Sequence, residues 1–244
     1  MRFTNKTVIV TGAAGGIGLA IVKRFASEGA NVALVDISND QLQQAISGMK
    51  DAEKNLMPAV CDVGNEDDVV KTVKNVIDRF GSLDVVINNA GLMIFKALEE
   101  TTKEDWDRIL KVDLLGAFFF TKQAFLQMKN GGSIVNISSI HALETTPMVT
   151  TYAAAKSAML SLTRSGSIEG KAKNIRVNAI LPGAIDTPML WNNPNIKAGL
   201  EQVSKDSVGK PEDIAAAAAF LASDDAAFVQ GAMIEVDGGR MDRL

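Results

Sequence analysis

Short runs of β-branched and apolar residues alternate along the chain with longer segments in which apolar residues recur about every 3.6 positions. The runs occupy residues 7–11, 31–35, 57–61, 83–88, 133–138, 175–181 and 233–236, and candidate helices begin near Gly16, Asn39, Asn65, Lys103, Thr150 and Pro211. Strands that are apolar throughout are typical of strands covered on both faces, and their alternation with helices indicates right-handed crossovers. The pattern therefore predicts an α/β fold, a three-layer, doubly wound Rossmann fold with about seven parallel strands.

The composition is that of a folded protein without a membrane segment. The chain has 244 residues, of which 47% are hydrophobic and 22% charged, which allows a full core and excludes intrinsic disorder. No repeat, low-complexity tract or Pro/Ser-rich linker divides it, so residues 1–244 are predicted to form a single domain. The apolar run at 215–222 is too short to cross a bilayer, and the segment 1–12 lacks the apolar region of a signal peptide. We therefore expect a cytoplasmic protein that spans no membrane.

Charge and cysteine content exclude further classes. Lys and Arg number 25 against 29 Asp and Glu, a formal net charge of −4, which offers no basic surface for a nucleic acid. The single cysteine, Cys61, cannot form an internal disulfide and cannot by itself build a zinc or iron–sulfur site. We therefore predict no nucleic-acid partner and no metal. Doubly wound sheets bind their ligands beyond the carboxyl ends of the strands, so we expect the chemistry there.

A glycine-rich turn follows the first predicted strand. The sequence Thr11-Gly12-Ala13-Ala14-Gly15-Gly16-Ile17-Gly18 leads directly into a helix with apolar spacing. Glycines such as Gly12, Gly16 and Gly18 let the backbone approach a ligand closely, so that a pyrophosphate can rest on the free N–H groups at the positive end of the helix. An ordinary turn that tolerates glycine is the alternative, but the strand before and the helix after supply the context of a dinucleotide site.

Polar residues end the second, third and fourth predicted strands. Asp36 can accept hydrogen bonds from both hydroxyls of an adenosine ribose and would repel a 2′-phosphate, so it favours NAD over NADP; a helix or turn cap is the alternative. Asp62 can accept an amino hydrogen from adenine, or it can cap the next helix. Asn88-Asn89-Ala90-Gly91 suits either bracing of the backbone beside a ligand or a plain turn.

A tyrosine and a lysine lie four positions apart, downstream of two serines. Ser138 and Ser139 end the fifth predicted strand, and Tyr152 and Lys156 fall on one face of a helix. A free tyrosine has a pKa of about 10, so a tyrosine base that works near neutral pH needs a positive charge nearby, such as the Lys156 ammonium. Ser139 could hydrogen-bond the substrate oxygen while Tyr152 removes its proton and hydride leaves for the cofactor. A surface Tyr/Lys pair is the alternative, against which the serine and the glycine-rich turn argue.

Together these motifs resemble the short-chain dehydrogenase/reductase family over essentially the whole chain. The resemblance rests on the glycine-rich turn, Asn88-Asn89-Ala90-Gly91, Ser139 with Tyr152 and Lys156, and Pro182-Gly183 followed by Ile185 and Thr187. It implies that Tyr152 is the catalytic acid/base, and that it and Lys156, which holds the nicotinamide ribose, also contact the cofactor. It implies further cofactor contacts from Ile17, Asp36, Asp62, Val63, Asn89, Ile185 and Thr187. It also implies a homotetramer or homodimer, with the helices at 103–128 and 150–168 packed between subunits.

One residue departs from the family pattern. Where members of the family commonly carry an asparagine, this chain has Asp113, on an apolar stripe of a predicted helix that would bury it. A buried carboxylate must be paired or protonated, because an isolated buried charge is too costly. We therefore predict an altered proton relay with Asp113 near Lys156, which makes Asp113 a fourth candidate catalytic residue. A structural carboxylate that caps a helix distortion is the alternative.

The substrate end of the predicted site is less informative. His141, the single histidine, lies two residues beyond Ser139 and is a candidate substrate contact with Ser139 and Tyr152, although a lone histidine is more often structural. The pattern Ser138-Ser139-Ile140-His141 resembles that of sugar-oxidising members of the family, the glucose 1-dehydrogenases. Residues 187–210 fall where a substrate lid is expected, and Trp191 with the nearby amides could hold a hydroxylated ring or pack on the domain.

The sequence thus predicts an NAD-dependent oxidoreductase that interconverts a small-molecule secondary alcohol, with sugars and polyols as candidates, and its carbonyl. One alternative is a 3-oxoacyl-carrier-protein reductase; Asp36 counts against it because reductive biosynthesis usually uses NADPH, and the acidic surface offers no evident patch for an acidic carrier protein. The other is a dinucleotide-binding sensor without turnover. The intact Ser139, Tyr152 and Lys156 argue against the sensor.

Overall fold

The structure is a computed structural model that describes residues 1–49, 54–199, 203 and 207–241. Within these residues seven strands form one parallel sheet in the order β3-β2-β1-β4-β5-β6-β7. The strands are β1 (Thr7–Thr11), β2 (Asn31–Asp36), β3 (Leu56–Val60), β4 (Val85–Asn88), β5 (Gly132–Ile137), β6 (Ile175–Pro182) and β7 (Met233–Val236). Every pairing between neighbours is parallel. The predicted α/β class and the seven predicted strands are confirmed.

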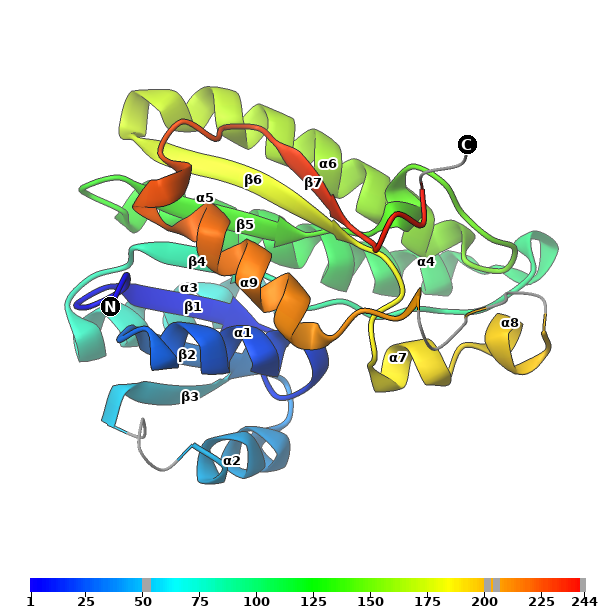
Figure 1. The fold of residues 1–244 in the computed structure, drawn as a ribbon, viewed down its shortest axis with the longest axis horizontal. Coiled ribbons are helices and arrows are strands. Elements are labelled where there is room, and N and C mark those ends of the chain that lie inside the picture. Colours follow the sequence, from blue (N-terminus) through cyan, green and yellow to red (C-terminus); the bar gives the residue numbers. More distant parts are fainter. Residues whose placement is uncertain (50–53, 200–202, 204–206, 242–244) are drawn as a thin grey trace.

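Helices cover both faces of this sheet (Figure 1). The α-helices of the described residues are α1 (Gly16–Ser27), α2 (Asn39–Ser47), α3 (Glu66–Phe80), α4 (Lys103–Ile109), α5 (Gly116–Gln127), α6 (Thr150–Gly170), α7 (Pro188–Trp191), α8 (Pro194–Lys197) and α9 (Pro211–Ala222). Side chains of α1, α2 and α9 share one apolar core with Val8 and Val10 of β1. Side chains of α3 and α5 share another core with Ile9, which points to the opposite face. Alternate residues of one strand enter different cores, which explains why the strands are apolar throughout.

The order of the strands reverses at β1, which lies between β2 and β4. Loops that leave the carboxyl ends of β1 and β4 therefore turn to opposite faces of the sheet, and the crevice between them is where doubly wound sheets bind ligands. The glycine-rich turn follows β1 directly, and α7 and α8 lie beyond the same end of the sheet (Figure 1). The fold thus places the predicted motifs at the carboxyl end of the sheet.

The helix predicted from Lys103 to 128 is interrupted. A π-helical turn, η3 (Leu110–Leu115), separates α4 from α5 and contains Asp113. The predicted burial of Asp113 is confirmed, since its side chain is 0% exposed. A π turn accommodates one residue more than an α turn, so a 3.6-residue spacing cannot reveal it, and such turns are frequent at functional sites.

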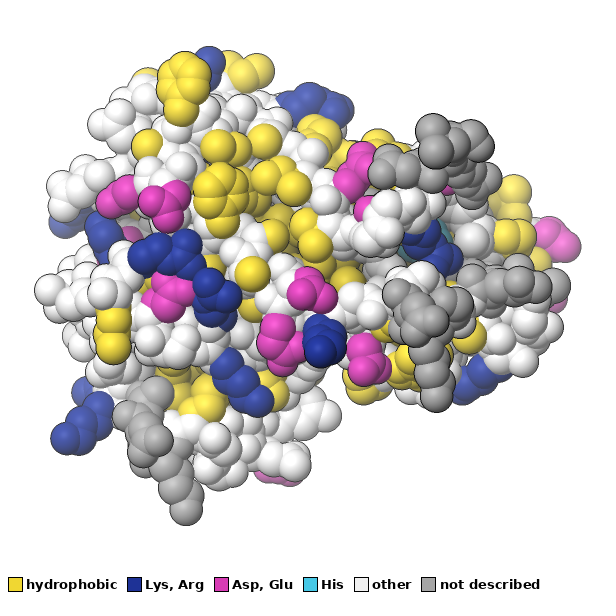
Figure 2. Space-filling model, viewed as in Figure 1, with side chains coloured by type: hydrophobic (Ala, Val, Ile, Leu, Met, Phe, Trp, Pro, Cys, Tyr) yellow, Lys and Arg dark blue, Asp and Glu magenta, His cyan; other side chains and the backbone are white. Residues whose placement is uncertain are grey.

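The surface mixes side chains of both charges. In the face drawn in Figure 2, Lys and Arg side chains are interspersed with Asp and Glu, and hydrophobic side chains gather over α9. Among the described residues no helix combines the length and apolarity that a membrane crossing requires. The same part of the chain contains no cluster of three or more His, Cys, Asp or Glu side chains that could hold a metal ion.

Candidate active site

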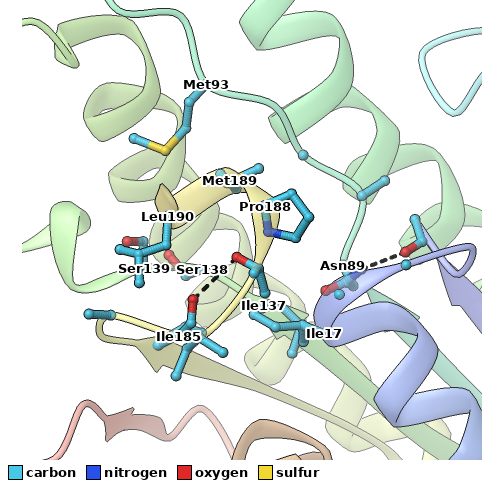
Figure 3. Close-up of a pocket in the computed structure, with 18 of the residues that line it drawn as sticks. Ile17, Asn89, Met93, Ile137, Ser138, Ser139, Ile185, Pro188, Met189 and Leu190 are labelled. Carbon is cyan, nitrogen blue, oxygen red and sulfur yellow. Dashed lines mark hydrogen bonds between the residues drawn. The ribbon is translucent and has the colours of Figure 1, made fainter. Parts of the chain in front are cut away.

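A cavity of about 1050 Å³ opens at the carboxyl ends of the strands. It brings together most of the residues that the sequence predicts for the site: Gly12, Gly16, Ile17, Asp36, Asn89, Ser139, His141, Tyr152, Lys156, Ile185 and Thr187. Figure 3 shows how the start of α1, the ends of β4 and β5, the loop after β6 and α7 surround this space. Its volume is at the upper end of the range for small-molecule sites. Four predicted residues are not in its lining: Gly18, Asp62, Val63 and Asp113.

The glycine-rich turn adopts a conformation that requires glycine. Gly12 and Gly16 have φ angles of 62° and 50°. A Cβ atom on Gly18 would lie 2.0 Å from the carbonyl oxygen of Gly12, so the first turn of α1 packs directly on the loop. The Asn89 amide closes the same loop by donating to the carbonyl oxygens of Thr11 and Gly12 at 2.9 and 3.1 Å. Asn89 therefore braces the backbone, one of the two roles its motif predicts.

Replacing Gly18 by Ala is expected to destabilise the protein by about 2 kcal/mol, because the new methyl group meets backbone that cannot yield. Gly15→Ala is the matched control, since Gly15 has extended backbone and a Cβ there would meet nothing within 4 Å. Urea unfolding of both variants without added cofactor measures the difference. Equal stability of the two variants would contradict the close packing of the turn.

Asp36 is held at the end of β2 by backbone donors. Its Oδ2 accepts from the Ala14 N–H at 3.1 Å, and its Oδ1 accepts from the Ile37 N–H at 2.8 Å. Both bonds leave further acceptor sites on the two oxygens, because a carboxylate can accept about four hydrogen bonds. Asp36 lines the cavity together with residues of the glycine-rich turn, so its carboxyl group can meet a ligand bound there.

Asp62 has a different environment from the one predicted. Its Oδ2 accepts from Lys111 Nζ at 2.7 Å and its Oδ1 accepts from the Gly64 N–H at 3.0 Å. The hydrogen bond from Lys111, with that from Gly64, lowers the pKa of Asp62 below its ordinary value. The Lys111 side chain also packs on Gly64, where a Cβ would lie 2.4 Å from its Cγ. Asp62 therefore ties the loop after β3 to the π-helical turn, and neither it nor Val63 lines the cavity.

The end of β5 is attached to α6 by side chains of both elements. Ser138 Oγ donates to the carbonyl oxygen of Lys156 at 3.0 Å, and Lys156 Nζ donates to the carbonyl oxygen of Ile137 at 3.2 Å. Lys156 Nζ lies 5.5 Å from the centre of the Tyr152 ring. All of these side chains are buried. The helical spacing of Tyr152 and Lys156 thus places both on the face of α6 that meets the cavity, as the sequence predicts.

Ser139 begins a short 3₁₀ helix, η4 (Ile140–Ala142), and its hydroxyl oxygen accepts from the His141 N–H at 3.1 Å. A hydroxyl that accepts in this way keeps its own proton free for another acceptor. The His141 ring stands edge-on to the Tyr152 ring, with 5.9 Å between the ring centres. The loop therefore holds Ser139 and His141 in the same cavity as the phenol.

Asp113 lies behind Lys156, away from the cavity lining. Its Oδ1 accepts from the Leu92 N–H at 3.0 Å, and its Oδ2 faces Lys156 Nζ at 3.4 Å. Within the described part of the chain Oδ2 forms no hydrogen bond. Burial raises the pKa of Asp113 above its ordinary value, while the charge of Lys156 opposes that rise. The predicted proximity of Asp113 and Lys156 is therefore present in the structure.

Residues 12–240 match the family described as Enoyl-(Acyl carrier protein) reductase. The chain is 37% identical over 243 residues to the 3-oxoacyl-(acyl-carrier-protein) reductase FabG of Thermotoga maritima, which covers 98% of this chain and 99% of that protein. It is 36% identical to the meso-2,3-butanediol dehydrogenase of Serratia marcescens, over 98% of this chain and 96% of that one. A crystal structure from Brucella melitensis, described as a short-chain dehydrogenase/reductase, glucose/ribitol dehydrogenase, superimposes with a TM-score of 0.89 at 35% identity and covers 98% of each chain. The chain belongs to the short-chain dehydrogenase/reductase family.

Membership of the short-chain dehydrogenase/reductase family makes the chain an oxidoreductase that uses a nicotinamide dinucleotide and acts on small molecules. The glycine-rich turn fits such a cofactor. Gly15 is the N-cap of α1 and provides no side-chain hydrogen bond, so the first N–H groups of this helix are left for a ligand. A Cβ atom on Gly15 would meet nothing within 4 Å, whereas a Cβ atom on Gly12 or Gly18 would collide with backbone atoms. A pyrophosphate can therefore approach the helix end.

The Tyr152 phenol of this family member is less acidic than the sequence predicts. Burial raises the pKa of Tyr152 above its ordinary value, and this effect outweighs the lowering by the charge of Lys156. The carboxylate of Asp113 raises the pKa further, and a hydrogen bond with Ser139 lowers it. The buried carboxylate of Asp113 offsets part of the charge of Lys156, and the spacing of Tyr152 and Lys156 in the sequence does not reveal that effect.

The segment predicted as a substrate lid is only partly described, because residues 200–202 and 204–206 lie outside the described residues. Its first part forms α7 and α8. Trp191 is not in the cavity lining, since its indole N–H donates to Asp186 Oδ1 at 2.7 Å. Asn193 lines the cavity, but its Oδ1 caps α8 by accepting from the Asn195 N–H at 2.9 Å. Thr187 Oγ1 donates to the carbonyl oxygen of Ile185 at 3.2 Å, which stabilises the start of this segment.

Sequence reasoning missed several residues of the site. Lys111 reaches Asp62 from the π-helical turn, and no sequence periodicity marks that turn. Met93, Met189 and Leu190 line the substrate end of the cavity (Figure 3). Single apolar residues in a loop or in a four-residue helix such as α7 carry no recognisable pattern, so only the folded arrangement reveals them.

Proposed function

We propose that this chain is an NAD-dependent oxidoreductase that interconverts a secondary alcohol and its carbonyl, with Tyr152 as the acid/base. The observation that carries the proposal is the convergence of Ser139, Tyr152 and Lys156 in the same cavity as the glycine-rich turn and Asp36. A nicotinamide ring bound there supplies the hydride acceptor or donor.

The side chains have distinct parts in the proposed reaction. The His141 N–H occupies the Ser139 oxygen, so the Ser139 hydroxyl can donate to the substrate oxygen. Tyr152 then removes the proton of that oxygen during oxidation and returns it during reduction. Lys156 places its positive charge near the phenol and is within the lining that would hold the nicotinamide ribose. Asp113 acts through Lys156 and is a positioning residue.

Most of the proposed cofactor contacts are residues that line the cavity. Ile17, Ile185 and Thr187 line the same cavity as Tyr152, and Asn89 supports the glycine-rich turn. Asp62 and Val63 are not in the cavity lining. For them to contact the adenine, the loop after β3 would have to move their side chains toward the cavity. These contacts remain predictions.

Asp36→Asn is expected to raise the ratio of catalytic efficiency with NADP to that with NAD by about tenfold, because it removes a negative charge next to the site of the 2′-phosphate. The Asn side chain keeps one oxygen for the Ala14 or Ile37 N–H, so the turn should survive. Asp40→Asn is the control, an exposed carboxylate outside the cavity lining. Steady-state rates with both cofactors measure the ratio, and an equal change in both variants would remove the role of Asp36.

Asp113→Asn is expected to lower the pKa of Tyr152, because the Asp113 charge raises it in the native protein. Tyr152 is the only tyrosine, so an absorbance titration of the phenolate reports this residue alone. Oxidation needs the ionised phenol, and the rate of alcohol oxidation should therefore rise at lower pH in the variant than in the wild type. An unchanged titration together with an unchanged pH profile would reduce Asp113 to a structural carboxylate.

The proposed function is tested by NADH or NADPH formation over a panel of secondary alcohols, polyols and aldoses. Turnover that requires NAD is the expected result. A second candidate, favoured by the similarity to the Thermotoga maritima enzyme, is a 3-oxoacyl-carrier-protein reductase. It would reduce 3-oxoacyl thioesters with NADPH and leave the alcohols untouched. Binding of NADH without turnover of either panel would instead support the sensor.

The proposal includes assembly into a homotetramer or homodimer in the cytoplasm. The segments that the family packs between subunits are residues 103–128, which form α4, η3 and α5, and residues 150–168 of α6. Exposed apolar side chains on them support this assignment: Phe118 and Leu126 on α5, and Ile168 on α6.

A further inference from the structure

The substrate end of the cavity has an apolar wall built from two separate segments. Met93 comes from the loop after β4, and Pro188, Met189 and Leu190 come from α7. Figure 3 shows these side chains around the end of the cavity where Ser138 and Ser139 lie. Thioether and aliphatic groups donate no hydrogen bonds and adapt readily to apolar shapes. The carbon atoms flanking the reacting centre would therefore meet apolar groups.

Several polar side chains at this end of the cavity form bonds of their own, and the buried Thr146 Oγ1 has no hydrogen-bond partner among the described residues. Trp191, which the sequence allows either to hold a hydroxylated ring or to pack on the domain, is bonded to Asp186 outside the cavity lining. The Asn193 oxygen caps α8. His141 Nδ1 and Thr145 Oγ1 lie 3.2 Å apart and bond each other, and Glu144 is exposed.

The part of the apolar wall that α7 provides is held in place by a contact of the neighbouring helix α8. Asn195 is 1% exposed, and its Nδ2 donates to the carbonyl oxygen of Pro147 at 2.9 Å, which ties α8 to the loop between β5 and α6. α7 lies immediately before α8 in the chain, so this contact limits how far Met189 and Leu190 can move from the cavity. A wall held in this way selects among substrates better than a loose one.

We propose that the substrate is an apolar alicyclic or branched aliphatic secondary alcohol, or its ketone, with few or no further hydroxyl groups near the reacting carbon. The proposal rests on the proposed function and replaces its sugar and polyol candidates. Ser139 and Tyr152 would bind the single reacting oxygen, and the wall of Met93, Met189 and Leu190 would cover the hydrocarbon. Hydroxyls that face this wall would lose water without gaining hydrogen-bond partners from it, which disfavours polyols.

A series of six-membered carbocycles tests the proposal at constant ring size: cyclohexanol, cyclohexane-1,2-diol and myo-inositol. Catalytic efficiency with NAD is expected to fall by about tenfold or more from the first to the last. Leu190→Gln should reduce the ratio of catalytic efficiency with cyclohexanol to that with myo-inositol by about tenfold, because it places a polar group in the wall. Leu98→Gln is the matched control, an exposed leucine outside the cavity lining, and should leave the series unchanged.

Ligand-observed NMR with the NADH complex separates this proposal from the proposed function. Binding of cyclohexanone in preference to myo-inositol, weakened by Leu190→Gln, supports the apolar substrate class whether or not turnover occurs. Such binding without turnover by the wild type would contradict the proposed function alone. Preferential binding or oxidation of myo-inositol, or no binding of either ring, would overturn the apolar substrate class.

Discussion

Tyr152→Phe is expected to reduce turnover by about a thousandfold while NADH still binds with nearly the affinity of the wild type. The substitution removes one oxygen from a buried ring and leaves its packing against His141 unchanged. Without the phenol, no group in the first turn of α6 can accept the substrate proton. Ser139 cannot replace it, because its oxygen accepts from the His141 N–H and its own proton is donated to the substrate oxygen in the proposed arrangement. The loss should therefore appear in kcat more than in KM.

Two measurements make this test specific. Stopped-flow or steady-state rates give the loss of turnover, and NADH fluorescence titration gives the binding. The far-UV spectrum and the urea midpoint of the variant should match those of the wild type. A variant that keeps more than a tenth of the wild-type rate would show that another group carries the proton.

Lys156→Met is expected to lower the free energy of unfolding by about 3 kcal/mol at neutral pH. Lys156 and Asp113 are 3% and 0% exposed, and their charged atoms lie 3.4 Å apart. Removing the lysine leaves the carboxylate buried with one hydrogen-bond donor among the described residues, the Leu92 N–H. Neutralising the carboxylate as well, in Lys156→Met/Asp113→Asn, should restore most of the stability.

The loss of stability in Lys156→Met should depend on pH. Burial raises the pKa of Asp113, and the charge of Lys156 is what opposes that rise. A carboxyl group whose pKa is raised by folding contributes its stability below the unfolded-state pKa, and this contribution is lost as the pH rises through the folded-state pKa. The single variant should therefore be least destabilised in acid and most destabilised at neutral and alkaline pH. The double variant should lack this dependence.

Urea unfolding at several pH values measures both effects. Lys122→Met is the matched control, because it removes the lysine of a solvent-exposed ion pair with Glu66 and should change stability little. An equal loss in Lys122→Met and Lys156→Met, or a double variant no more stable than the single one, would contradict a buried ion pair.

Much of the fold could be predicted from the sequence because it depends on short-range patterns. The strands are read from apolar runs, and the glycine-rich turn from residues whose backbone angles only glycine adopts easily, as the φ of 62° at Gly12 illustrates. Tyr152 and Lys156 follow from helical geometry. In each case the local structure is determined by residues that are close together in the chain.

The parts that the sequence could not supply depend on contacts between distant segments. Asp62 follows β3 as predicted, but Lys111, 49 residues further along the chain, holds its carboxylate outside the cavity lining. The π-helical turn around Asp113 breaks the periodicity from which the helix is predicted. Trp191 was assigned to the lid, and only the bond to Asp186 shows that it turns away from the cavity lining.

Transfer of a labelled hydride tests the central claim most directly. The wild-type protein is incubated with NAD and a secondary alcohol that carries deuterium on its carbinol carbon, and the reduced cofactor and the ketone are quantified by mass spectrometry. The account predicts one deuterium in the cofactor for each ketone formed, with no such product from Tyr152→Phe in the same time. Reduced cofactor without deuterium, or no reduced cofactor from any alcohol of the panel, would contradict it.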